Sequence, residues 1–277
     1  MPLQISRAAA MAAALLLTAA APAPAASAAD AQELRFAPHR AVYDMRLSAA
    51  RGSRGATSIQ GLMEFTWRDV CDGWSIDYKS RMQVTFAEQG TRELSWNYSS
   101  WESDDGREFR FFLRRYAGGQ ETLRSRGEAE LTPGEGGTAA FTQPEQRSIE
   151  LPPDTLFPKA HSEAIVRAAQ AGDTFLWRHV FDGTGEDGGL FGVNATILKP
   201  LQPDQDLPLQ HELLAGQPSW RMSLAYFPAG ARESTPESEQ SMRMFANGVV
   251  GTLTIDYGDF VVVAELTELE ALDRPDC

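Results

Sequence analysis

Hydrophobic and polar residues alternate with a period of two over long stretches of this chain. The clearest stretch is WSIDYKSRMQVTF at residues 74–86, in which the apolar face carries Trp74, Ile76, Tyr78, Met82, Val84 and Phe86. Such alternation predicts a long β-strand with one buried and one hydrated face. Residues 61–68 alternate in the same way, and Asp72-Gly73 between the two stretches predicts a hairpin turn.

Further strand-like segments follow at short spacing. They cover residues 39–49, 91–101, 107–117, 120–131, 138–150, 174–183, 190–200, 218–227, 238–246, 249–257 and 260–270. Short turn sequences rich in glycine and aspartate separate them, which favours antiparallel meanders over βαβ units. The pattern therefore predicts an all-β fold with a single large antiparallel sheet of about a dozen or more strands. Such a sheet must curl or close to protect its edges.

One segment, FPKAHSEAIVRAAQAGD at residues 157–173, has a different pattern. Pro158 is tolerated in a first helical turn and Gly172 is typical of a helix end. The interior is rich in strong helix formers, which predicts one α-helix at about 158–171. Its apolar stripe is made mostly of small residues and comprises Ala160, Ala164, Ile165, Ala168 and Ala169. We expect this helix to pack on a sheet face, the alternative being a helix that binds a partner.

The N-terminal residues have the pattern of a secretory signal peptide. Arg7 precedes an apolar run at residues 8–20, and small residues follow as far as Ala28 and Ala29. We expect residues 1–29 to be a signal peptide cleaved near Ala28/Ala29, and residues 30–277 to form one domain. The apolar run is shorter than a membrane span, and no later stretch approaches one. The prediction is an exported, periplasmic protein without a membrane span.

The net charge and the placement of charged residues limit the kinds of partner and environment that suit this chain. The net charge of −13 argues against nucleic acid as a ligand, because nucleic-acid binding needs a positive surface. Alternating strands also occur in outer-membrane barrels, but charges on the outward faces, as at Lys79 and Arg81, argue against that alternative.

The chain has two cysteines, Cys71 in the stretch DVCDGW and Cys277 as the last residue. In an oxidising compartment a pair of cysteines usually forms a bridge, so we predict a Cys71–Cys277 disulfide. The alternative is a catalytic or metal-binding thiol. Two thiol ligands are too few for a structural zinc site, and no C-x-x-C motif is present, so the disulfide is favoured.

Motifs for catalysis are missing from the sequence. None of the four histidines belongs to an H-E-x-x-H motif, and no G-x-S-x-G motif occurs. The sequence leaves open a Ser-His-Asp triad assembled from distant strands. The stretch 181–189, FDGTGEDGG, has some features of a calcium loop, but the sixth position lacks glycine and the twelfth is Val193. A glycine-rich hairpin end is the favoured interpretation, and no catalytic residue, cofactor or metal site is predicted.

Aromatic residues on the apolar faces suggest a binding groove. The candidates are Trp67, Trp74, Tyr78, Trp96, Trp177 and Trp220. They could line an apolar groove for an acyl chain or a glycan. The alternative is that they form an ordinary hydrophobic core.

Several segments together resemble a known family. They are APHRAVYDMRL at 37–47, CDGW at 71–74, FPKAHSEAIVRAAQAGD at 157–173, FDG at 181–183 and the terminal Cys277. In this order they resemble the EipB family of bacterial cell envelope integrity proteins. The resemblance implies a periplasmic protein whose sheet curls into a spiral-like, incompletely closed barrel with a helix packed on it. It also implies a disulfide at Cys71 and Cys277 and no catalytic residue.

The resulting expectation is a non-enzymatic periplasmic protein. It would support envelope integrity and stress resistance by binding an envelope component, such as a lipid or cell-wall component, or a periplasmic protein partner. Two alternatives stay open at this point. One is a lipid or glycolipid carrier that resembles the periplasmic lipoprotein carriers, and the other is a hydrolase that acts on the cell wall.

Overall fold

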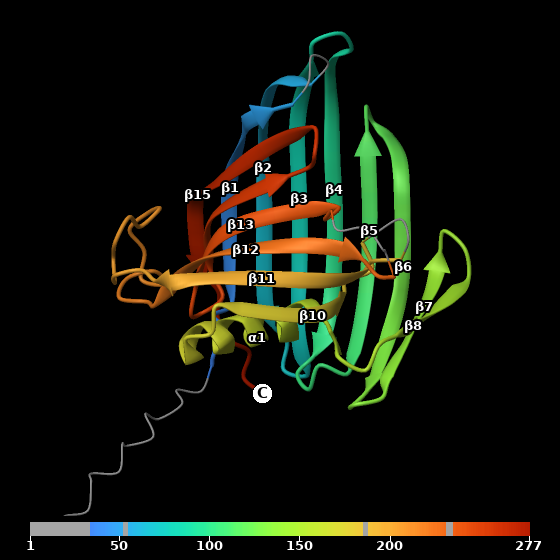
Figure 1. Ribbon diagram of the computed structural model, residues 1–277, viewed down its shortest axis with the longest axis vertical. Helices are drawn as coiled ribbons and strands as arrows, with labels where there is room; N and C mark the ends of the chain where they lie inside the picture. Colours follow the sequence, from blue (N-terminus) through green and yellow to red (C-terminus); the bar gives the residue numbers. More distant parts are fainter. Residues whose placement is uncertain (1–33, 52–54, 185–187, 231–234) are drawn as a thin grey trace, which may run out of the picture. The chain divides into compact units, whose positions relative to one another are not determined.

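The alternating segments of the chain pair edge to edge into one large sheet (Figure 1). The structure is a computed structural model that describes residues 34–51, 55–184, 188–230 and 235–277. Within these residues the sheet has fifteen strands, in the order β8-β7-β6-β5-β4-β3-β2-β1-β15-β14-β13-β12-β11-β10-β9. The signal peptide expected at residues 1–29 lies outside the described residues.

The bounds of the elements follow the chain. The strands are β1 His39–Ala50, β2 Ala56–Asp69, β3 Gly73–Phe86, β4 Gly90–Ser103, β5 Glu108–Ala117, β6 Gln120–Thr132, β7 Gly136–Gln143, β8 Arg147–Leu151, β9 Thr155–Leu156, β10 Phe175–Phe181, β11 Leu190–Pro200, β12 Ser219–Pro228, β13 Ser238–Phe245, β14 Val250–Asp256 and β15 Phe260–Ala271. The helix α1, Pro158–Ala171, lies between β9 and β10 in the chain.

The order of the strands explains why the sheet closes almost completely. β15 pairs with β1, so the two ends of the described chain lie in the middle of the sheet. The two edges are β8 and β9, which residues 152–154 connect directly. Four residue steps reach at most about 15 Å, so the edges must approach each other at this point. The expected incompletely closed barrel of about a dozen or more strands is thereby confirmed.

The strand expected at 138–150 is in fact two strands. β7 ends at Gln143 and β8 begins at Arg147, with Pro144 between them. Proline has no backbone N–H to donate to a strand ladder, so it interrupts the strand and permits a turn. The antiparallel β7–β8 hairpin that results forms one edge of the sheet.

The period of two separates an inner face of the sheet from an outer one. Along β3, Trp74, Met82 and Val84 are buried, whereas Lys79 and Arg81 are exposed. In Figure 1, β11, β12 and β13 cross in front of β2, β3 and β4. One core cluster combines the inner faces of both groups, since it contains Trp67 and Trp74 together with Met222, Leu224 and Met244. The inner faces of the two halves of the sheet therefore face each other.

Helix α1 packs on this interior as expected. Pro158 stands in its first turn, and Gly172 ends it in the left-handed conformation, with φ 83°. Ile165 and Ala168 are buried in the same core cluster as Trp74. Two residues of the expected buried stripe, Ala160 and Ala164, are only half-buried; the residues that are fully buried are Lys159, His161, Ile165, Val166, Ala168 and Ala169. In the part of the chain that the structure describes, no helix is long and apolar enough to cross a membrane.

Candidate functional site

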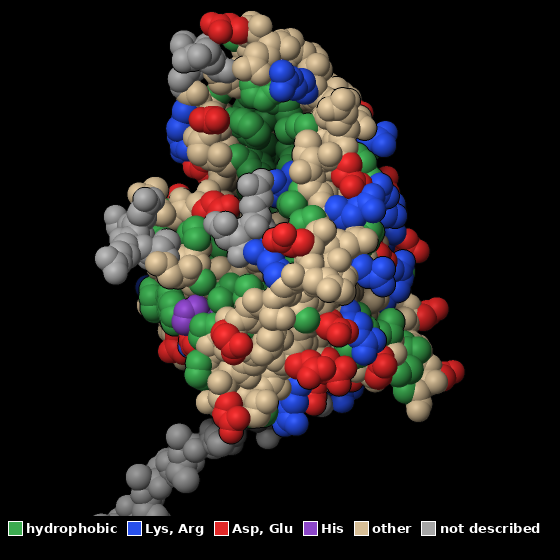
Figure 2. All heavy atoms as spheres, turned by 90° about the vertical axis from the view of Figure 1, so that its right-hand side faces the viewer, with side chains coloured by type: hydrophobic (Ala, Val, Ile, Leu, Met, Phe, Trp, Pro, Cys, Tyr) green, Lys and Arg blue, Asp and Glu red, His purple; other side chains and the backbone are tan. Residues whose placement is uncertain are grey.

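A cavity of about 410 Å³ lies between the two facing halves of the sheet. Its wall is formed by inner-face residues of β1, β2, β3, β10, β12, β13 and β14 and by one face of α1. The volume lies within the range of about 300–1,000 Å³ that is typical of small-molecule sites. Figure 2 shows the molecule hollowed at the top of that view, with walls made largely of hydrophobic side chains.

Most of the cavity wall is apolar. The apolar lining residues are Met63, Phe65, Ile76, Ile165, Val180, Leu224, Met242, Met244, Val250, Leu253 and Ile255. Three of them are methionines, whose unbranched and polarisable side chains adapt to ligands of irregular shape. The wall therefore suits an alkyl chain better than a rigid polar molecule.

His39, at the start of β1, places an imidazole on this wall. Its Nδ1–H donates a 2.7 Å hydrogen bond to the carbonyl oxygen of Ala37. Burial lowers the pKa of His39, so the ring is neutral and Nε2 carries no proton. No hydrogen-bond partner contacts Nε2 in the structure, although the side chain is only 1% exposed. His39 thus lines the cavity and carries an acceptor that has no partner among the described residues.

Trp67, on β2, stands directly opposite His39 in the β1–β2 pairing. Its indole packs edge-on against Trp74, with ring centroids 5.5 Å apart, and lies 4.8 Å from the ring of Phe36. These contacts hold the indole plane in place. Its Nε1–H, which can only donate, has no hydrogen-bond partner among the described residues, and the side chain is 3% exposed.

His161 enters the cavity wall from α1. Burial, together with the positive charge of Arg178, lowers its pKa to about 4. The imidazole is therefore neutral near pH 7. Within the part of the chain that the structure describes, its Nε2 has no hydrogen-bond partner, and the residue is 5% exposed. Three buried side chains on the same wall thus carry an unpaired polar nitrogen.

Glu102, on β4, fixes the start of the helix that carries His161. The N-cap residue of α1, Phe157, supplies no side-chain cap. Instead Glu102 accepts hydrogen bonds from the backbone N–H groups of Lys159 and Ala160, at 2.7 and 2.9 Å. A carboxylate at this end also complements the helix dipole. Burial nevertheless raises the pKa of Glu102 to about 7.

The polar part of the wall contains no cation. Among the described residues that line the cavity there is no lysine or arginine. The half-buried Asp182 accepts hydrogen bonds from the backbone N–H and the hydroxyl of Thr184, and burial raises the pKa of Asp182 to about 6. Tyr43 donates a 2.8 Å hydrogen bond to the carbonyl oxygen of Val250. Any fixed charge on this wall is therefore negative.

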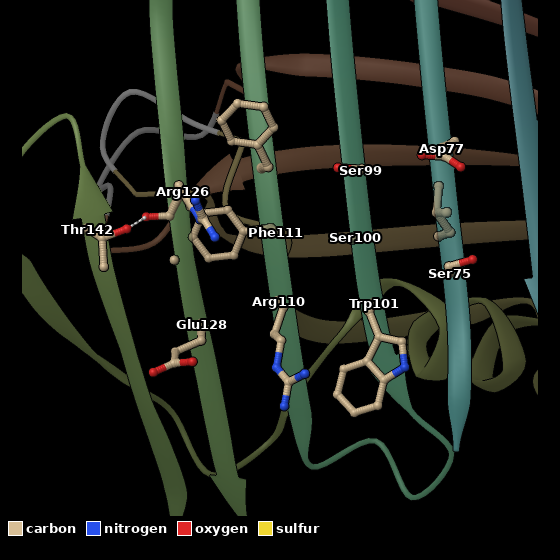
Figure 3. A pocket seen from close by; sticks show the side chains of 13 residues that line it. Ser75, Asp77, Ser99, Ser100, Trp101, Arg110, Phe111, Arg126, Glu128 and Thr142 are labelled. Atoms are coloured by element: carbon tan, nitrogen blue, oxygen red, sulfur yellow. Dashed lines mark hydrogen bonds between the residues drawn. The ribbon is translucent and has the colours of Figure 1, made fainter. Parts of the chain in front are cut away.

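A second concavity lies over β3 to β7, and most of its lining residues are polar or charged (Figure 3). Ser75 and Asp77 alternate along β3 with the inward-facing Trp74, Ile76 and Tyr78, so they belong to the outer face. The guanidinium of Arg110 lies 4.6 Å from the ring centroid of Trp101. Two further charged side chains of this concavity, Arg126 and Glu128, are exposed to solvent. The hydrated outer concavity does not exclude water from a ligand, and the inner cavity is the stronger candidate site.

The structure brings together only some of the aromatic residues expected to form a groove. Trp67 and Tyr78 line the cavity. Trp74 and Trp220 are buried in the adjoining core cluster, and Trp96 packs on a second cluster. Trp177 is 41% exposed, because it lies on the opposite face of β10 from Val180, and it packs edge-on against His179.

Sequence reasoning missed the two cavity histidines. His39 occupies the same face of β1 as Ala41, Tyr43 and Met45, all of which are buried. A histidine in an otherwise apolar period-two series was therefore a usable signal. His161 had no such signal, because its burial depends on how α1 is rotated against the sheet.

A disulfide joins Cys71, in the β2–β3 turn, to the C-terminal Cys277, with the two Cα atoms 5.7 Å apart. Next to it, Arg274 forms a 2.8 Å ion pair with Asp69 and lies over the ring of Trp74. The C-terminus is thereby attached to the turn that precedes β3. The candidate calcium loop at 181–189 lies partly outside the described residues. No group of three or more potential metal ligands occurs among the described ones.

The sequence profile of the EipB-like family matches residues 30–273. The chain belongs to the EipB-like family. A curated member, the cell envelope integrity protein EipB of Brucella abortus (strain 2308), is 28% identical over 250 residues, which cover 89% of this chain and 88% of that protein. The resemblance drawn from the five sequence segments is therefore confirmed.

A solved structure shares the EipB-like fold. It is the crystal structure of a β-barrel-like protein, a domain of unknown function, from Brucella abortus. The superposition has a TM-score of 0.79 and 25% sequence identity, and it covers 87% of this chain and 100% of the other. The relatives thus support an envelope-integrity role for the family and a barrel-like fold for the chain.

Proposed function

We propose that this EipB-like protein is a non-enzymatic periplasmic protein that supports envelope integrity by holding an apolar envelope component in its inner cavity. The observation that carries the proposal is the cavity of about 410 Å³ with its mainly apolar wall. The Brucella relative is a cell envelope integrity protein, and this supports the proposed cellular role. The signal-peptide pattern at residues 1–29 and the Cys71–Cys277 disulfide support an oxidising, exported location.

Binding is favoured over hydrolysis by the arrangement of the histidines. Among the described residues, the two cavity histidines, His39 and His161, have no carboxylate partner of the kind that orients a general base. An Asp–His pair does occur, between Asp154 and His179 at 2.6 Å, but no described serine hydrogen-bonds to that imidazole. A zymogram on peptidoglycan tests the hydrolase alternative, and a cleared zone would contradict the proposal.

Filling the cavity tests the proposed function in cells. Gln240 lines the cavity from β13, and its neighbour Glu239 lies on the outer face of the same strand. Gln240→Trp would place an indole in the cavity, whereas Glu239→Trp would place it in solvent. In a deletion strain that is sensitive to detergent and cell-wall antibiotics, the wild type and Glu239→Trp should restore resistance, and Gln240→Trp should not.

Two outcomes would contradict the proposal. One is a deletion strain whose sensitivity is unchanged. The other is full restoration by Gln240→Trp when immunoblots show it in the periplasm at the wild-type level. The same inner cavity also supports the alternative of a lipid carrier. If the protein is a carrier, native mass spectrometry of protein taken gently from the periplasm should show an adduct of lipid mass.

A further inference from the structure

The inner cavity carries unpaired polar atoms that point to a bound molecule. They are Nε2 of His39, Nε1 of Trp67 and Nε2 of His161, each on a side chain that is more than nine-tenths buried. Buried polar groups in native proteins almost always have a hydrogen-bond partner, because leaving one unpaired is costly. All three residues line the same cavity. A polar group of a ligand would give these atoms the partners they lack.

The neighbouring pair of His39 and Trp67 specifies what that polar group is. The two residues are directly opposite each other in the β1–β2 pairing, with ring centroids 6.3 Å apart. His39 Nε2 accepts a hydrogen bond, since Nδ1–H is already donated to Ala37. Trp67 Nε1–H donates one. A hydroxyl group both donates and accepts, so it complements the pair, whereas a carboxylate or phosphate oxygen only accepts.

The charge of the wall excludes an anionic headgroup. No lysine or arginine is among the described residues that line the cavity, and the carboxyl of Asp182 is. Arg178, whose charge acts on His161, is not part of the wall. An anion buried there would lose its hydration without gaining a counter-charge. The headgroup therefore carries no negative charge, and an ammonium group, which only donates, would leave the Trp67 Nε1–H without an acceptor.

We propose that the cavity binds a neutral lipid with a hydroxyl headgroup, of the monoacylglycerol type. The headgroup is bound by His39, Trp67 and His161, and the acyl chain lies among the apolar and methionine side chains. This inference rests on the proposed function, because it names the class of ligand that the same cavity would hold.

Two probes with the same chain and different headgroups test it. 1-Decanoylglycerol and decanoate, each below its critical micelle concentration, would be titrated calorimetrically into the mature, disulfide-bonded protein at pH 8. The neutral probe should bind at least about tenfold more tightly, because only its hydroxyl groups match the donor and acceptor of the wall.

A matched pair of tryptophan variants locates the headgroup. Trp220, like Trp67, is buried with an unpaired Nε1, but it does not line the cavity. Trp67→Phe removes the donor and keeps a ring, so it should weaken the binding of decanoylglycerol about three- to tenfold and leave that of decanoate unchanged. Trp220→Phe should change neither. The ratio of the affinities for decanoylglycerol and decanoate separates the loss of a headgroup contact from a general loss of packing. A general loss of packing would weaken the binding of both probes.

The outcomes distinguish this inference from the proposed function. Equal or tighter binding of decanoate, no binding of either probe, or an unchanged ratio in Trp67→Phe would overturn the assignment of a neutral headgroup. The proposed function would still stand if Gln240→Trp failed to restore resistance in cells. If Gln240→Trp restored resistance fully, the proposed function itself would be wrong.

Discussion

The carboxylate of Glu102 accepts a hydrogen bond from the backbone N–H of Lys159 across 57 residues of sequence, at 2.7 Å. Through this contact a strand of the sheet supplies the cap that α1 lacks in its own sequence. The carboxylate is 2% exposed, so the contact combines the cost of burying a charge with the gain of two hydrogen bonds.

Glu102 should make stability depend on pH. Its pKa is about 7 in the folded protein against 4.5 for the unfolded reference, so the folded state binds the extra proton between these values. The free energy of unfolding contributed by this group should therefore fall as pH rises from about 4.5 to 7, by roughly 2–3 kcal/mol. Urea denaturation of wild type and Glu102→Gln across pH 5–8 measures it as the part of the fall that the variant lacks, since Asp182, whose pKa is also raised, contributes equally to both proteins.

The comparison of wild type with Glu102→Gln also cancels an opposing pH dependence that comes from two histidines. His39 and His161 have lowered pKa values when folded, so their contribution to stability rises with pH up to about 6.5. That contribution is the same in both proteins and cancels in the difference. Glu128→Gln, at an exposed position of β6, serves as the control and should keep the wild-type slope. A difference between wild type and Glu102→Gln that is constant with pH would contradict the prediction.

Cys277→Ser should destabilise the protein markedly. The disulfide closes a loop with a sequence separation of 206, which reduces the conformational entropy of the unfolded chain. We expect the free energy of unfolding to fall by about 2–5 kcal/mol. Cys71→Ser and the double variant should show the same loss, since all three lack one bond. Unchanged denaturation midpoints for Cys277→Ser would show that the bond contributes nothing to stability.

Arg274→Ala should loosen the C-terminal segment while the disulfide stays intact. The guanidinium pairs with Asp69, lies over the ring of Trp74 and donates to the carbonyl oxygen of Phe36. Because the arginine is about half exposed, we expect a loss of only about 1 kcal/mol. Thermal unfolding and limited proteolysis would measure it. Arg92→Ala, at an exposed position of β4, should melt like the wild type.

Gly73→Ala should weaken the contact between β3 and β4. A Cβ atom at Gly73 would overlap the backbone carbonyl oxygen of Glu102, so the strands would have to separate. We expect a loss of about 2 kcal/mol or more. Gly118→Ala, in the β5–β6 turn, has φ 56° and open space around it, and should cost only about 1 kcal/mol of backbone strain. Denaturation midpoints of the two variants measure both losses. Equal losses in Gly73→Ala and Gly118→Ala would contradict the predicted overlap at Gly73.

Much of this fold could be predicted locally. The alternation along residues 74–86 identifies β3 and its buried face, and Pro158 with Gly172 marks both ends of α1. Both signals depend only on neighbours in sequence, through the two-residue period of strands and the end preferences of helices. The break at Pro144 was missed because the alternation on either side of it is short.

The candidate site was less predictable. Trp67 and Trp177 have similar sequence surroundings, yet one lines the cavity and the other is exposed. The pattern also did not reveal that His39 and Trp67 would stand opposite each other, since that depends on the β1–β2 register. The cap of α1 by Glu102 joins residues whose sequences carry no sign of each other.

The amino-acid sequence alone predicted the strands, the helix, the pair of cysteines and the family. It did so because alternation, helix ends and motif order are properties of the chain read along its length. The tertiary structure decided which inner faces meet across the curled sheet, and so which polar nitrogens come to line an apolar cavity. That outcome depends on the curvature and register of fifteen described strands together, and these are set by long-range pairing.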